Sequence, residues 1–206
     1  MGLLLHIHPE TPSEKNIRKA VEIIEKGGVA IYPTDSVYGM GCSIFNKDGI
    51  EKLALYKGTK PSLAEFSFLF SDIDQLVDYI KPMTKDIFKI LKRNLPGPFT
   101  FILPASNKLP KSLENRRKTI GIRIPDNNIV REIVRGLGHP LVNTSIHAID
   151  DVVEYQTDPS LIWDRFKDKV DLVIDGGFGN NEPSTVVDLS GEEPEIIRQG
   201  IGELII

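Results

Sequence analysis

The stretch from residue 32 to residue 42, YPTDSVYGMGC, gathers side chains and glycines that can surround a small ligand. The hydroxyl of Thr34 can both donate and accept a hydrogen bond. Gly39 and Gly41 mark places where a ligand or another backbone can come close. The same residues also suit a plain corner between two strands, in which Thr34 caps the turn. The sequence leaves both interpretations open.

A second candidate is Arg123, which lies in the apolar run KTIGIRIP. An arginine among apolar strand residues is costly unless its charge is paired. Its planar guanidinium can bind a carboxylate through two parallel hydrogen bonds, a geometry that lysine lacks. Arg123 therefore either holds an anionic ligand or forms a structural ion pair.

Other patterns argue against several kinds of chemistry. The chain has no P-loop, no dinucleotide-binding glycine fingerprint, no H-E-x-x-H motif and no G-x-S-x-G motif. His6 and His8 alternate along one strand and could share a metal, but surface histidines on a terminal strand explain them better. Cys42, the only cysteine, excludes an intramolecular disulfide and is interpreted as a core residue. No protein-bound metal or organic cofactor is expected.

The composition is that of an ordinary soluble protein, with 206 residues of which 40% are hydrophobic and 26% charged. This length suits one core, so residues 1–206 are expected to form a single domain. No apolar run approaches the roughly 18 residues of a membrane span, and the N-terminus lacks a signal peptide. We therefore expect a cytoplasmic protein with no membrane partner, whose oligomeric state the sequence does not determine.

Positive charge is concentrated in one part of a chain whose net charge is −4. The basic residues between positions 108 and 123 are Lys108, Lys111, Arg116, Arg117, Lys118 and Arg123, and the single acidic residue there is Glu114. A local basic face can bind a polyanion whatever the net charge. A solvated helix face and loop is the simpler explanation.

The elements that must position these residues are short helices that alternate with apolar strands. Helices are expected at residues 12–26, 47–57, 72–80, 83–94, 126–138 and 160–166. Strands are expected at residues 28–33, 36–44, 99–104, 118–125, 139–145, 170–175, 184–189 and 194–200. Thr11 and Asp126 are the expected N-caps of the first and fifth helices. The pattern predicts an α/β fold with a mixed sheet, in which the closely spaced late strands form antiparallel pairs.

Several motifs keep a fixed order along the chain: YPTDSVYGMGC, Lys57-Gly58, PGPFTFILP, KTIGIRIP, LVNTS, IDGG, PSTVVDL and IIRQG. Together they resemble the YrdC/YciO family, which includes the L-threonylcarbamoyladenylate synthases of tRNA modification. The resemblance covers residues 12–202 and implies a twisted mixed sheet with flanking helices and a concave basic cavity. It also implies that ATP, threonine and bicarbonate bind there to give threonylcarbamoyl-AMP and pyrophosphate, and that double-stranded RNA or tRNA is a partner.

The resemblance assigns roles to individual residues. Those expected at the threonine substrate are Thr34, Arg123 and Ser184. Those expected at the nucleotide are Lys57, Thr119, Ser145 and Arg198. Lys57 and Arg123 are also the expected catalytic residues, Lys57 because charge that develops on phosphate needs cations nearby and Arg123 because it would orient threonine. ATP, with Mg²⁺, is the candidate substrate.

Two positions depart from the family pattern. Thr59 stands where the synthases carry the arginine of a K-x-R motif, and His147 stands where they carry the asparagine of an S-x-N motif. The first change removes a planar cation from the phosphate site. The second places the hydrogen-bonding nitrogens differently from those of an amide. Both departures resemble the YciO branch of the family.

Three functions remain open. The first is a nucleotide- and double-stranded-RNA-binding relative of the synthase whose synthase motifs are partly degraded. The second is a fully active threonylcarbamoyladenylate synthase, and the third is a module that binds a small anion without using ATP. The sequence alone does not decide whether the chain is an enzyme.

Overall fold

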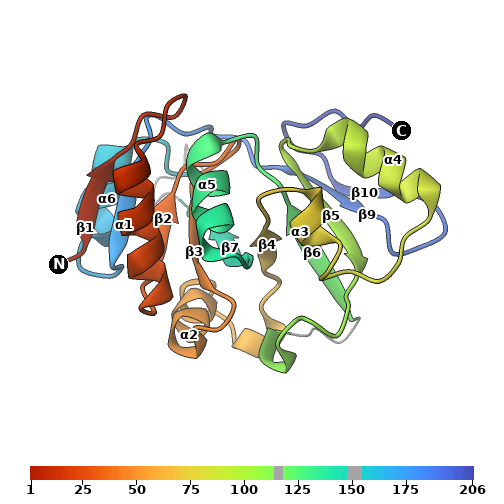
Figure 1. The fold of residues 1–206 in the computed structure, drawn as a ribbon, viewed down its shortest axis with the longest axis horizontal. Helices are drawn as coiled ribbons and strands as arrows, with labels where there is room; N and C mark the ends of the chain where they lie inside the picture. The colour runs from red at the N-terminus through yellow and green to blue at the C-terminus, as the bar shows by residue number, and fades with distance from the viewer. Residues whose placement is uncertain (114–117, 148–154) are drawn as a thin grey trace.

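A computed structural model describes residues 1–113, 118–147 and 155–206. The strands are β1 Leu3–His6, β2 Ala30–Tyr32, β3 Gly39–Ser43, β4 Ser67–Leu69, β5 Phe99–Pro104, β6 Thr119–Arg123, β7 Leu141–Ser145, β8 Leu172–Asp175, β9 Thr185–Asp188 and β10 Glu195–Arg198. Across these described ranges they form one ten-stranded sheet in the order β1-β8-β2-β3-β7-β4-β6-β5-β9-β10 (Figure 1). Parallel pairs such as β4–β6 mix with antiparallel pairs such as β3–β7, which confirms the predicted α/β class with a mixed sheet.

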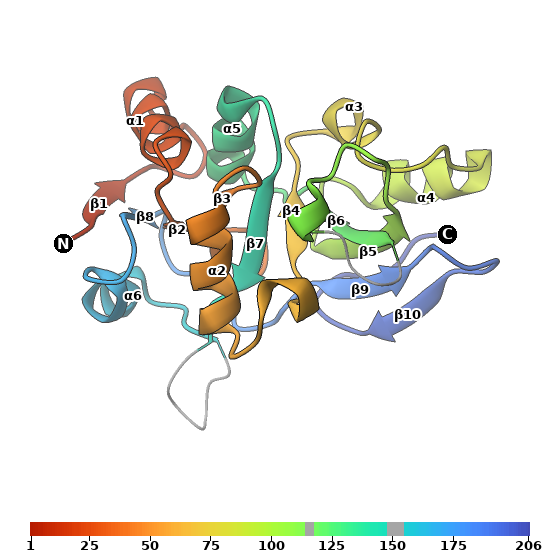
Figure 2. The same cartoon turned by 90° about the horizontal axis from the view of Figure 1, so that it is seen from below.

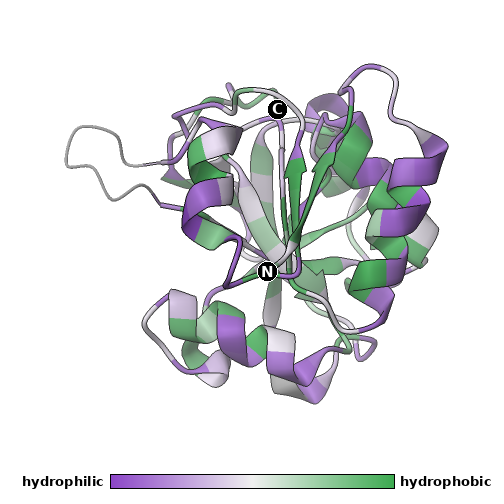
Figure 3. Cartoon of the chain, turned by 90° about the vertical axis from the view of Figure 1, so that its left-hand side faces the viewer, coloured by the Kyte–Doolittle hydropathy of each residue, from purple (hydrophilic) through white to green (hydrophobic). Residues whose placement is uncertain are grey.

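The helices are α1 Glu14–Glu25, α2 Lys47–Tyr56, α3 Ile73–Leu76, α4 Lys85–Asn94, α5 Asn128–Leu137 and α6 Pro159–Phe166. Short 3₁₀ turns lie at Pro61–Leu63 and Lys111–Leu113. Helices α1 and α5 lie side by side, and α2 lies along β3 and β7 (Figure 2). Figure 3 shows hydrophobic and hydrophilic residues on different sides of the helices, as expected for helices that cover a sheet. None of the helices in the described part of the chain is long and apolar enough to cross a membrane.

Two predicted N-caps are wrong by one or two residues. Helix α1 begins after Ser13 rather than after Thr11. Helix α5 is capped by Asn127, whose side chain accepts a hydrogen bond from the backbone N–H of Val130 at 3.2 Å. Asp126 lies one residue earlier, and its backbone N–H donates to Asp35. Helix α5 ends with the C-cap Gly138, the last residue of the predicted range, whose φ of +69° is a left-handed conformation that suits glycine.

The central strand β4 was not predicted, and two other elements differ from expectation. Strand β4 is only three residues long, but it joins β7 to β6 in the middle of the sheet. The helix expected at 72–80 is reduced to the single turn α3. Strands β9 and β10 are antiparallel as predicted, whereas β8 lies at the opposite end of the sheet and is parallel to both β1 and β2.

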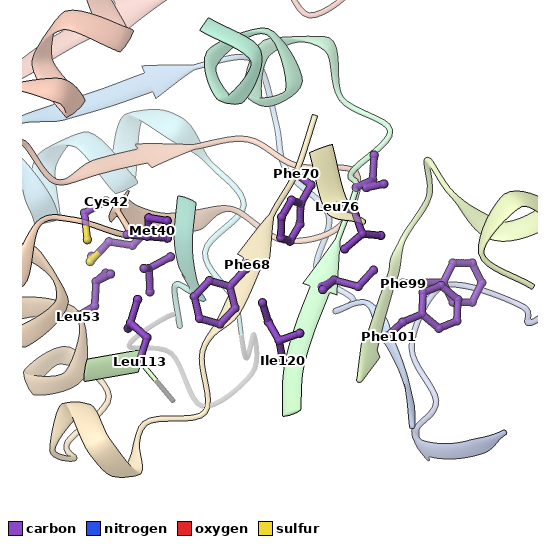
Figure 4. Close-up of a cluster of buried hydrophobic side chains, with 14 of the residues drawn as sticks. Met40, Cys42, Leu53, Phe68, Phe70, Leu76, Phe99, Phe101, Leu113 and Ile120 are labelled. Carbon is purple, nitrogen blue, oxygen red and sulfur yellow. The ribbon is translucent and has the colours of Figure 1, made fainter. Parts of the chain in front are cut away.

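The core is divided between the two faces of the sheet. One cluster contains Phe68, Phe70 and the stacked rings of Phe99 and Phe101, whose centroids are 5.5 Å apart (Figure 4). It also contains Cys42, which is fully buried as predicted, and burial raises the pKa of its thiol to about 12. On the other face, alternate strand residues pack against α1 and α5.

Candidate functional site

A cavity of about 450 Å³ lies over strands β4, β5, β6, β7 and β9. This volume falls in the range of small-molecule sites, roughly 300–1,000 Å³. The residues that line it are Lys57, Ala64, Glu65, Phe66, Ser67, Phe68, Thr100, Ile102, Leu113, Thr119, Gly121, Arg123, Asn143, Thr144, Ser145, Ser184, Val186, Asp188, Ile197 and Arg198.

The strand register explains why these residues meet. Asn143 is paired with Ser67, Ser67 with Gly121, Gly121 with Ile102, and Ile102 with Asp188. Residues paired across neighbouring strands project to the same face of a sheet, so these five form one row. The row runs across β7, β4, β6, β5 and β9, all of which contribute to the cavity.

A second row lies beside the first. Thr100 and Arg123 each lie two residues along their strand from a member of the first row and therefore share its face. Val186 is paired with Thr100, and Arg198 with Val186. The oxygens Oγ1 of Thr100 and Oγ of Ser184 are 2.9 Å apart, and Arg198 donates to the carbonyl oxygen of Ser184 at 2.7 Å. The hydroxyls of Thr100 and Ser184 thus lie close to the guanidinium of Arg198.

Most of the predicted site residues come together at this cavity. Those in its lining are Lys57, Thr119, Arg123, Ser145, Ser184 and Arg198. Thr34 is buried outside the lining, where its hydroxyl donates to the carbonyl of Val37 at 2.7 Å and accepts from the backbone N–H of Ser36 at 3.1 Å. Its hydroxyl is thus engaged in the turn, and a contact between Thr34 and a substrate stays a prediction.

Arg123 forms the structural ion pair that its sequence context allowed, whereas its contact with an anionic ligand stays a prediction. Its Nη2 donates to Oδ1 of Asp35 at 3.0 Å and to Oγ of Ser36 at 2.9 Å, and the two charged side chains are only 3% and 8% exposed. Burial lowers the pKa of Arg123, while the charge of Asp35 opposes that change. The Nε–H of Arg123 has no hydrogen-bond partner in the described ranges, although the residue also lines the cavity. The ion pair therefore leaves one buried donor of this side chain unused.

Lys57 lines the cavity and is the C-cap residue of α2. Desolvation lowers the pKa of Lys57, the nearby carboxylate of Glu65 opposes this, and Arg198 lowers it further. The charged lining residues in the described chain are Lys57, Arg123, Arg198, Glu65 and Asp188. Three cations against two carboxylates leave the lining with one excess positive charge.

The sequence prediction did not include Ser67, Thr100, Asn143 or Asp188. Thr100 could have been found from the alternation in FTFILP, where every second residue is buried and the others, including Thr100, are less so. Asn143 could have been found as an amide within an otherwise buried strand, LVNTS. Ser67 could not, because the strand that carries it was not predicted.

The two departed positions lie outside the cavity lining. The backbone N–H of Thr59 donates to the carbonyl of Ala54 at 3.0 Å, just beyond the end of α2. His147 is exposed and stacks on Tyr155, with ring centroids 5.1 Å apart.

At the N-terminus, His6 lies 2.9 Å from a carboxylate oxygen of Asp175. The described residues contain no cluster of three or more side chains that could hold a metal ion.

The basic run between residues 108 and 123 does not form one continuous surface in the described chain. Lys108 is paired with Asp78, and Arg123 is buried. Lys111 and Lys118 are exposed, while Arg116 and Arg117 lie outside the described residues. Binding of double-stranded RNA or tRNA through this run stays a prediction.

Comparisons with known proteins agree with the fold. A family model described as "Telomere recombination", which combines Sua5, YciO and YrdC, matches residues 22–200. The chain belongs to the Sua5/YciO/YrdC family. An uncharacterised protein of Haemophilus influenzae is 40% identical over 98% of this chain and 97% of its own length.

Two solved structures of this family show how closely the fold is shared. The crystal structure of E. coli YciO superposes with a TM-score of 0.91 at 36% identity and covers 98% of both chains. P. abyssi Sua5, crystallised in complex with L-threonine, superposes with a TM-score of 0.84 at 25% identity. That match covers 96% of this chain but 57% of Sua5, so Sua5 has a further part that the match does not include.

Proposed function

We propose that this chain binds a nucleotide and a small amino acid together in the cavity, as a relative of threonylcarbamoyladenylate synthase whose capacity for synthesis is reduced. The observation that supports this most is the convergence on one cavity of six predicted residues from five separate segments: Lys57, Thr119, Arg123, Ser145, Ser184 and Arg198. The complex of the family member Sua5 with L-threonine supports the amino acid as one ligand.

The chemistry of the lining suits these two ligands. Arg123 and the hydroxyl of Ser184 can orient the carboxylate and hydroxyl of threonine. Lys57 and Arg198 can bind the phosphates of ATP, which enters with its own Mg²⁺. In the synthase reaction, the amine of threonine takes up CO₂ as a carbamate, and the carbamate oxygen attacks the α-phosphate. The bond to pyrophosphate then breaks, and pyrophosphate leaves with the electron pair.

Reduced synthesis follows from the residues at the departed positions. Thr59 supplies no guanidinium where the synthases have one, and neither Thr59 nor His147 reaches the cavity lining. The loss of one donor to developing charge costs about 3 kcal/mol of transition-state stabilisation, about a hundredfold in rate. Glu65 also offsets part of the positive charge of Lys57.

The test separates binding from turnover. Calorimetric titration should show binding of L-threonine and of ATP to the wild-type chain, and Arg198→Ala should weaken ATP binding. In an assay with ATP, threonine and bicarbonate, pyrophosphate and threonylcarbamoyl-AMP should form slowly, and the double change Thr59→Arg with His147→Asn should accelerate both. Turnover at the ordinary enzyme rate of about 10 per second would contradict the reduced capacity. If L-threonine or ATP fails to bind, the whole proposal is contradicted.

A further inference from the structure

Three hydrogen-bonded side chains run from the core to the lining of the cavity. Tyr32, fully buried on β2, donates from its hydroxyl to Oδ1 of Asn143 at 3.1 Å. Asn143 in turn donates from Nδ2 to Oγ of Ser67 at 2.9 Å. Asn143 and Ser67 line the cavity, whereas Tyr32 lies behind them against α1 and α5. A buried phenol is thus linked through an amide to a hydroxyl that a ligand can touch.

The direction of these hydrogen bonds is fixed at the buried end. Burial raises the pKa of Tyr32 well above its ordinary value, so the phenol keeps its proton and must donate it. Oδ1 of Asn143 accepts that proton. If the amide were turned over, its N–H could donate to the phenol oxygen, but the buried phenolic hydrogen would then lack an acceptor. Asn143 must therefore present its N–H groups to Ser67.

Ser67 is left with a proton to donate. Its Oγ already accepts from Asn143, and a hydroxyl has only one hydrogen. Within the described ranges its acceptor is the carbonyl of Asn143, 3.5 Å away, which is at the limit of a hydrogen bond. An oxygen of a ligand in the cavity offers a better acceptor.

Two glycines of the stretch YPTDSVYGMGC make room for this arrangement. A Cβ atom on Gly41 would lie 2.1 Å from the hydroxyl of Tyr32 and 2.5 Å from the carbonyl of Val142. A Cβ atom on Gly39 would lie 2.3 Å from Oδ1 of Asn143. Both distances to the hydrogen-bonded pair are shorter than any tolerable contact, so the Tyr32–Asn143 pair requires both glycines.

We propose that Ser67 determines ligand specificity by donating a hydrogen bond to an anionic oxygen of the ligand, and that Tyr32 and Asn143 are positioning residues that hold its proton in that direction. The inference rests on the proposed function, because the oxygen belongs either to the carboxylate of the amino acid or to a phosphate of the nucleotide. A ligand that presents an N–H group instead of an oxygen to Ser67 gains less binding free energy.

Calorimetric titrations of L-threonine and of ATP, each alone, against the full chain test the inference. Ser67→Ala should weaken binding of one of the two ligands about tenfold, as expected for a hydrogen bond to a charged group, and that ligand supplies the oxygen. Tyr32→Phe should weaken binding of the same ligand about threefold. In the Ser67→Ala background it should cause no further loss of affinity. Tyr38→Phe is the matched control, since this buried tyrosine donates to the carbonyl of Gly177 at 2.6 Å, outside the lining.

The possible failures are distinguishable. If the wild-type chain binds both ligands and Ser67→Ala changes neither affinity, this inference is wrong while the proposed function stands. Additive effects of Tyr32→Phe and Ser67→Ala would also overturn it. If the wild-type chain binds neither ligand, the proposed function fails and this inference with it. Nuclear magnetic resonance tests the hydrogen bond between Tyr32 and Asn143 directly. Tyr32→Phe should shift the signals of the Asn143 side-chain amide, whereas Tyr38→Phe should not.

Discussion

At the scale of single residues, the pair of Arg123 and Asp35 bears on both stability and binding, because Arg123 is paired with Asp35 and also lines the cavity. Both side chains are almost completely buried, so removing one charge leaves the other without compensation in a medium of low polarity. We expect Asp35→Asn to lower the free energy of unfolding by about 3 kcal/mol, as measured by urea denaturation. The further change Arg123→Met should restore much of this loss, because no charge then remains buried.

The control for this prediction is the exposed pair of Asp86 and Lys89, whose charged atoms lie 2.9 Å apart, close to the 3.0 Å of the buried pair. Asp86→Asn should change the free energy of unfolding by less than about 0.5 kcal/mol, since water already screens that pair. If Asp35→Asn costs no more than Asp86→Asn, the buried pair does not stabilise the fold. Arg123 would then be held for the ligand alone.

At the scale of elements, β3 can approach β2 and β7 only because Gly41 lacks a side chain. A Cβ atom there would meet the backbone carbonyl of Val142 as well as Tyr32, and backbone cannot move aside without disturbing the sheet. We expect Gly41→Ala to cost about 1–3 kcal/mol, the usual range for overpacking. Gly191→Ala is the matched control, because its nearest neighbour would be 3.9 Å away. Equal melting temperatures of the two variants would contradict the close approach.

The short helix α3 provides a pH-dependent test of an element boundary. Asp72 caps it by accepting from the backbone N–H of Gln75 at 2.9 Å, and this hydrogen bond lowers the pKa of Asp72. Because the folded pKa lies below the unfolded one, the stabilisation is present above the unfolded pKa and is lost as the pH falls through the folded pKa. We expect Asp72→Ala to cost about 1 kcal/mol at pH 7 and less once the pH falls through the folded pKa of Asp72.

Urea denaturation at a series of pH values measures this difference. Asp74→Ala, which removes an exposed carboxylate from the same helix, is the control. A cost of Asp72→Ala that stays constant down to pH 2 would mean that the charge of Asp72 does not contribute.

At the scale of the whole molecule, local patterns predicted elements but not how they meet. The β5 run FTFILP and the α5 run NIVREIVRGL have clear periodicities and were found correctly. Strand β4 was missed because three residues are too few to show a period. Contacts between distant segments, such as Tyr32 with Asn143 and Asp35 with Arg123, depend on sheet order and register, which no local pattern encodes.

The position of the cavity at one half of the sheet leads to a prediction about the whole chain. A ligand at one hundred times its Kd stabilises the native state by about 2.7 kcal/mol. For a chain of 206 residues this should raise the melting temperature by about 5–10 °C. Hydrogen exchange should slow most in β4, β6 and β7, which line the cavity, and least in β1 and β8 at the other end of the sheet. Protection that is strongest in β1 and β8 would place the ligand elsewhere, because a bound ligand suppresses first the local openings that expose its own site.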